Sequence, residues 1–126
     1  MLGILKIRIL HRFLNRKAMN EDKDFLYDDD DSVQFIKNFL PEPVKQKFND
    51  DDISYIVDLI YDFYESKGYM DGEDDELVEI EFDEDELTTF IINNALSDGI
   101  GKYEAEDIAL VVQGEMDYCD SIGMFE

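Results

Sequence analysis

The sequence predicts a single small domain that is mainly α-helical, with three to five helices, a basic amphipathic N-terminal segment before it and room for a short two-strand element. Three segments carry the residue order that is typical of a helix start, and a fourth apolar segment ends at two prolines. A length of 126 residues supports one domain with its own core. The hydrophobic fraction of 44% argues against a wholly disordered chain, although 35% of the residues are charged.

The three helix starts share an aromatic residue, a polar N-cap, an acid and then an aliphatic residue, and they lie at 48–53, 82–87 and 103–108. This order is typical of a hydrophobic staple around a capping box. Asn49 and Asp83 are favourable N-caps, whereas Glu104 is a poor one. The starts predict helices over 50–67, 84–97 and 105–121.

A shorter helix is predicted from Ser32 to Leu40, because Pro41 and Pro43 cannot continue it. The first long helix is expected to end at Gly68 and the second before Gly99, since glycine tolerates the left-handed backbone that closes many helices.

The segment 78–82 alternates between apolar and acidic residues and therefore predicts a short, half-buried strand. Residues 100–103 could pair with it. The acid-rich stretches 20–31 and 70–76 are expected to be solvated loops.

Charge divides the chain sharply. Residues 1–20 hold five Lys and Arg and no acid, whereas residues 21–126 hold six lysines and all 33 acids, a net charge of −27. No arginine follows Arg16, and arginine is the usual bidentate donor for phosphate. We therefore expect no direct nucleic-acid binding by the acidic body, whose field repels DNA.

The N-terminal arm, residues 1–18, has three interpretations. On a helical wheel Arg8, Arg12 and Asn15 cluster beside apolar positions, so the arm could form a basic amphipathic helix on an anionic membrane or a partner. It could instead pack against the acidic body, or be a peripheral extension of a chain that starts near Met19. We divide the chain accordingly into this arm, an acidic linker over 19–31 and an acidic helical domain over 32–126.

The composition weighs against catalysis. His11 and Cys119 are the only residues of their types, which leaves no Cys/His zinc set and no internal histidine to activate a nucleophile. We therefore predict a non-enzymatic protein with no cofactor and no metal. Charges interrupt every apolar run well before the roughly 20 residues of a membrane span, and no signal-peptide cleavage site follows the arm. A cytoplasmic protein is expected.

One loop has a faint resemblance to the second half of an EF-hand calcium loop, through Asp98, Gly101 and Asp107. Leu96 and Ile100 would take the first and fifth positions, and neither side chain can coordinate calcium. High-affinity calcium binding is therefore not expected there. Weak binding of Ca²⁺ or Mg²⁺ to residues 71–76 stays open.

The helix predicted over 50–67 leaves one polar stripe between its apolar positions. The stripe holds four acids flanked by two tyrosines, namely Asp51, Asp58, Asp62, Glu65, Tyr55 and Tyr61. It is either an ordinary solvated face or a surface for a basic protein, since acids steer a basic partner and tyrosines supply contact area.

Asn94 and Glu115 occupy positions where apolar residues are expected. A buried carboxylate needs partners. An Asn94–Glu115 or Lys102–Glu115 contact, or a place at the helix edge, would satisfy Glu115 without catalysis. Gly114 indicates either close packing or a helix break.

These observations favour an acidic protein-interaction module that binds a basic partner. In charge character alone it is comparable to nucleic-acid mimics, nuclease inhibitors and immunity-type proteins. The alternatives are a helical domain that responds to divalent cations (Ca²⁺ or Mg²⁺) and a membrane-surface adaptor that uses residues 1–18.

Overall fold

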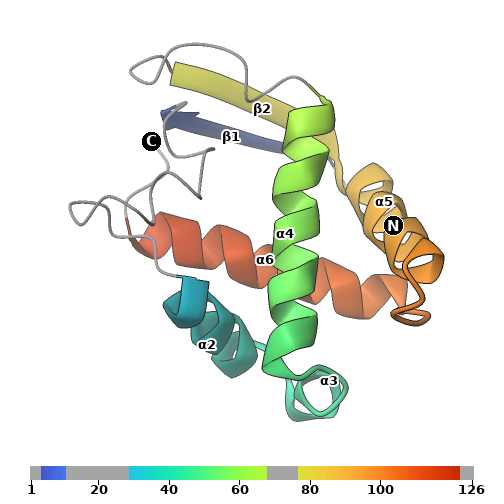
Figure 1. The fold of residues 1–126 in the computed structure, drawn as a ribbon. Helices are drawn as coiled ribbons and strands as arrows, with labels where there is room; N and C mark the ends of the chain where they lie inside the picture. Colours follow the sequence, from blue (N-terminus) through green and yellow to red (C-terminus); the bar gives the residue numbers. More distant parts are fainter. Residues whose placement is uncertain (1–3, 11–28, 68–76, 123–126) are drawn as a thin grey trace.

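The structure is a computed structural model that describes residues 4–10, 29–67 and 77–122, and this part of the chain is mainly helical (Figure 1). Its elements in order are β1 (Ile4–Leu10), α2 (Asp29–Phe39), α3 (Glu42–Lys45), α4 (Asp50–Ser66), β2 (Leu77–Asp83), α5 (Glu84–Ser97) and α6 (Ala105–Ser121). The predicted fold class is confirmed.

The three long helices follow the predicted starts. α5 and α6 have the predicted bounds, and α4 ends one residue early, at Ser66. Asn49 forms the predicted capping box with Asp52, and the Asp83 side chain accepts a hydrogen bond from the backbone N–H of Asp85. Glu104 makes no side-chain cap, as expected of a poor capping residue.

Of the predicted helix ends, the one at Gly99 agrees with the structure and the one at the two prolines is incomplete. Gly99 follows the C-cap of α5 with a φ of +73°, the left-handed backbone that glycine adopts easily. The prediction that the prolines only end a helix was incomplete, because Pro41 caps the short helix α3 and Pro43 stands in its first turn. Gly68 lies outside the described residues.

α2 begins at Asp29, so residues 29–31 form its first turn and not the predicted loop. Acids are stabilising in a first turn because they face the positive end of the helix dipole. The remaining residues of the two predicted acidic loops, 20–28 and 70–76, lie outside the described part of the chain.

The two strands pair antiparallel, which places Lys6 opposite Glu81 and Arg8 opposite Glu79. Two expectations are thereby corrected. Residues 4–10 are a strand and not the amphipathic helix of one interpretation, and residues 100–103 do not pair with β2. An alternation of apolar and basic residues suits a strand beside an acidic one, since opposite charges across strands attract. Residues 11–18 lie outside the described part.

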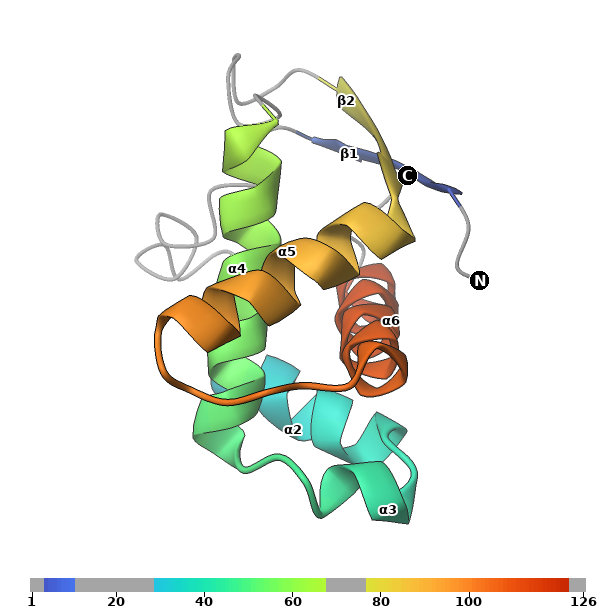
Figure 2. The ribbon, with the colours of Figure 1, turned by 90° about the vertical axis from the view of Figure 1, so that its right-hand side faces the viewer.

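The core lies around α4, which packs against α2, α5 and α6. Both views place α2 and α3 at one end of α4 and the strand pair at the other (Figures 1 and 2). Ile53, Ile56 and Ile60 of α4 are fully buried. Where α2 meets α6, a Cβ on Gly114 would lie 3.2 Å from Phe39 Cδ1. This confirms close packing at Gly114, and α6 continues through it without a break.

Candidate functional site

The polar stripe of α4 carries four exposed carboxylates, which we call the acidic ridge: Asp51, Asp58, Asp62 and Glu65. On its other side the helix buries eight residues between Ile53 and Tyr64. Within the described part of the chain, Asp51, Asp62 and Glu65 take part in no ion pair. These three carboxylates therefore present charge that the ion pairs of the described fold do not use.

The lysines that could neutralise the ridge are engaged elsewhere. The four ion pairs that they form are Lys37–Asp50 at 2.8 Å, Lys45–Glu42 at 3.6 Å, Lys47–Asp107 at 2.9 Å and Lys67–Glu86. In the third pair Asp107 is buried, and its hydrogen bond raises the pKa of Lys47. Three of these pairs join different parts of the fold and Lys45–Glu42 lies within α3; none of the four involves a carboxylate of the ridge.

The two tyrosines of the predicted surface differ in position. Tyr55 is half-buried beside the ridge and its hydroxyl donates to Asp98; burial, together with Asp98, raises the pKa of Tyr55 to about 12. Tyr61 is only 8% exposed and its hydroxyl donates to Glu115 Oε2 at 2.8 Å. The expectation that Tyr61 lines the surface is therefore corrected, because its hydroxyl satisfies an interior carboxylate.

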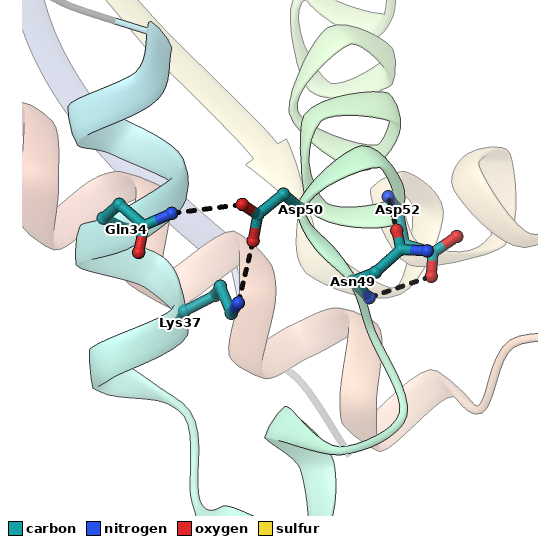
Figure 3. A network of polar contacts seen from close by, with 5 residues as sticks. All are labelled: Gln34, Lys37, Asn49, Asp50 and Asp52. Carbon is teal, nitrogen blue, oxygen red and sulfur yellow. Dashed lines mark hydrogen bonds and ion pairs between the residues drawn. The ribbon is translucent and has the colours of Figure 1, made fainter.

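An open pocket of about 250 Å³ between α2 and α4 adjoins the N-terminal end of the ridge. Its lining consists of Asp30, Val33, Gln34, Asp50, Asp51 and Ser54. Asp50 accepts hydrogen bonds from Lys37 at 2.8 Å and from Gln34 at 3.3 Å (Figure 3). The hydrogen bond from Lys37 lowers the pKa of Asp50. Since Asp51 belongs to both features, the ridge and the pocket form one acidic surface.

Glu115 is buried, with 1% of its surface exposed. Ser32 Oγ donates to its Oε1 at 2.7 Å, Tyr61 donates to its Oε2, and Cys119 Sγ lies 3.8 Å from Oε2. The sequence singled out Glu115 but did not predict Ser32 and Tyr61 as its hydrogen-bond donors. These donors come from two other helices, and the residues around Glu115 in the sequence do not indicate them.

The predicted partners of Glu115 were wrong. Asn94 is half-buried and donates to the carbonyl oxygen of Phe90, one turn back in its own helix, at 2.7 Å. A short amide side chain readily bonds its own backbone in this way. Lys102 is exposed. Glu115 thus belongs to a packed interior and not to the helix edge.

The acids of the calcium-like loop are engaged separately. Asp98 accepts from Tyr55, and Asp107 pairs with Lys47. The described ranges hold no group of three or more His, Cys, Asp or Glu residues placed to bind a metal ion. Residues 71–76 lie outside these ranges. Among the described helices, none combines the length and the apolar character needed to cross a bilayer.

No protein-family model, curated protein or solved structure matches this chain.

Proposed function

We propose that this protein is a non-enzymatic, acidic interaction module that binds a basic protein through the ridge of α4 and the adjoining pocket. One observation carries the proposal: exposed carboxylates stand in a row on a helix while the described lysines of that region pair elsewhere. The comparison with nucleic-acid mimics, nuclease inhibitors and immunity-type proteins belongs to this proposal, as does a cytoplasmic location.

Electrostatics favours such a role. Exposed charges of one sign repel each other and oppose a compact fold, yet they speed the approach of an oppositely charged partner. The chain carries a net charge of −22. An acidic helix face with a half-buried tyrosine at its border offers both charge and contact area to a basic surface.

The test is affinity capture with the full chain as bait, from lysate of the source cells, with elution by a rising NaCl gradient. We expect one dominant basic protein that salt releases, since screening shortens the reach of exposed charges to about 3 Å at 1 M salt. Purified partner and chain are then compared by titration calorimetry at two ionic strengths.

A ridge variant and a matched control locate the surface. The ridge variant is Asp51→Asn, Asp58→Asn, Asp62→Asn and Glu65→Gln; the control changes four other exposed acids, Asp85→Asn, Glu104→Gln, Glu106→Gln and Asp120→Asn. Both remove four negative charges. We expect the ridge variant to bind about tenfold more weakly or worse and the control to bind nearly normally. Equal losses, or binding that salt does not change, would contradict the proposal.

A further inference from the structure

β2 has an edge with no neighbouring strand in the part of the chain that the structure describes. The sheet there consists of β1 and β2 alone, so β1 occupies one edge of β2 and leaves the other. The strand pair lies at one end of the molecule, beyond the C-terminal end of α4 (Figures 1 and 2). A strand edge offers backbone N–H and C=O groups to another extended segment.

The side chains of β2 decide which segment could pair there. Ile80 and Phe82 are buried, at 0% and 4% exposure, whereas Glu79 and Glu81 between them are exposed. A strand added to this edge would meet two carboxylates, two residues apart, on the outer face of the sheet. Lysine or arginine at the facing positions would be attracted to them.

β1, on the other edge of β2, already places basic side chains opposite these two acids. Its exposed residues Lys6 and Arg8 stand opposite Glu81 and Glu79, and Lys6 Nζ lies 3.9 Å from Glu81 Oε2. The strand that β2 already binds therefore alternates basic and apolar residues in register with its acids.

We propose that the edge of β2 that has no strand beside it in the described part of the chain receives an extended basic segment of the partner as a third strand, with Lys or Arg residues two positions apart facing Glu79 and Glu81. This inference rests on the proposed function, because it takes the partner to be basic, and it adds a second contact beyond the ridge. Main-chain hydrogen bonds supply affinity in this mode and the facing charges supply selectivity.

Glu79 and Glu81 also disfavour pairing of this edge with a second copy of the chain. β2 of another copy would bring Glu79 and Glu81 beside their own equivalents, and like charges on neighbouring strands repel. Two chains of net charge −22 each add further repulsion. The edge therefore discriminates by charge between a copy of itself and a basic segment.

The probe for this site is a capped peptide with the sequence of residues 4–10, added to the isotopically labelled full chain. We expect NMR shift changes and slowed amide hydrogen exchange confined to β2 and its neighbours, with an affinity that falls as salt rises. A peptide with glutamate in place of the lysine and the arginine serves as the control, and it should not bind.

A disulfide between β1 and β2 distinguishes a peptide that adds to β2 as a third strand from a peptide that replaces β1. Leu10 and Leu77 are paired positions in the register, so Leu10→Cys with Leu77→Cys can join β1 to β2 by a disulfide without touching the two acids. Peptide binding that survives in the oxidised, stapled chain supports the free edge. Binding that stapling abolishes would show that the peptide replaces β1, and this would overturn the proposal.

In the stapled chain, Glu79→Lys with Glu81→Lys should weaken peptide binding about tenfold or more. The matched control, Glu106→Lys with Asp120→Lys, changes the net charge equally on α6 and should leave binding nearly unchanged. Equal losses would overturn the proposal.

The captured partner separates this inference from the proposed function. If the strand variant still binds the partner at full strength while the ridge variant does not, the edge proposal fails and the proposed function stands. If no basic protein is captured at all, the proposed function fails, whatever the peptide does.

Discussion

Glu115 is a carboxylate held inside the protein by hydroxyl groups that come from two other helices. Its replacement by alanine would remove two buried hydrogen bonds, those from Ser32 and Tyr61 to the carboxylate. Because a hydrogen bond to a charged group contributes about 1.5–3 kcal/mol, we expect Glu115→Ala to lower the free energy of unfolding by about 3 kcal/mol.

Urea unfolding measures the effect of Glu115→Ala, with Asp120→Ala as the control. Asp120 is exposed on the same helix, so its change should stay within about 0.5 kcal/mol. Equal effects of the two changes would show that the hydroxyls find other acceptors.

Tyr103 offers a prediction of the opposite sign. Its buried hydroxyl oxygen makes no hydrogen bond of ordinary geometry within the described residues, although the carboxylate of Asp52 lies close enough to act on it. Its ring packs edge-to-face on Phe48 with centroids 5.5 Å apart. Tyr103→Phe keeps the ring contact and removes the unsatisfied group, so stability should rise by about 1 kcal/mol. Tyr55→Phe is the control; it loses a hydrogen bond to Asp98 and should lower stability. A loss of stability in Tyr103→Phe would mean that the hydroxyl has a partner.

The same residue affects stability in alkali. Burial, with the charge of Asp52 adding to it, raises the pKa of Tyr103 to about 12, above the value of about 10 in an unfolded chain. The folded state therefore binds the proton more tightly, so its stability falls as the pH rises from about 10 to 12. Tyr103→Phe should make this fall shallower, as urea midpoints across that range would show.

At the scale of elements, Asp50 joins α4 to α2. The hydrogen bond from Lys37 lowers the pKa of Asp50, so the ionised form is favoured in the folded state. Its contribution is present above the unfolded pKa of about 3.9 and is lost as the pH falls through the lower folded pKa. Asp50→Asn should therefore lower the urea midpoint at pH 7, and the difference from the parent chain should vanish in acid.

Asp51→Asn is the matched control for the Asp50 change. Both acids lie in the first turn of α4 and face the same helix dipole, but Asp51 makes no ion pair within the described residues. A loss as large for Asp51→Asn would assign the effect to the dipole and not to Lys37.

Gly114 sets how closely α2 and α6 approach. A Cβ there would lie 3.3 Å from two carbons of Ile36, which is fully buried, so Ile36 would have to shift to admit a larger side chain. Gly114→Val should therefore lower the free energy of unfolding by about 2 kcal/mol or more. Gln113→Val is the control, because it places the same β-branched side chain at an exposed position of α6, where the cost is a few tenths of a kcal/mol of helix propensity. A similar loss in both variants would assign the effect to valine in a helix and not to the close approach of α2.

The sequence predicted correctly those elements that are determined by residues close together in the chain. Helix starts at Asn49 and Asp83 depend on residues within one turn, and they are where the caps predict them. The partner of β2 is a segment 67–79 residues away in the chain, and the basic and apolar residues of β1 were interpreted as an amphipathic helix, so this strand was not predicted. The exposed acids of the ridge were predicted for the same local reason, whereas the burial of Tyr61 depends on α6.

For the whole molecule, charge is the feature that folding does not explain. The described lysines of the helical body that form ion pairs do so with acids that join or cap elements, such as Asp50 and Asp107. Asp51, Asp62 and Glu65 of the acidic ridge lie outside these pairs. The ridge charges should therefore lower the stability of the fold while they raise the affinity for the proposed partner, and both effects can be measured on the same variant.

The C-terminal half of the ridge gives the clearest contrast. Asp62 lies four residues after Asp58 and three before Glu65, so like charges are neighbours on the helix surface, near the negative end of the α4 dipole. Asp62→Asn with Glu65→Gln should raise the free energy of unfolding by about 0.5–1 kcal/mol in low salt, by relieving this repulsion. The gain should shrink in 1 M NaCl, where the same charges are screened in the parent chain. The same variant should bind the captured basic protein more weakly. If this variant is less stable than the parent chain and binds the partner with the same affinity, these acids stabilise the fold. The proposal that the ridge is the binding surface would then be wrong.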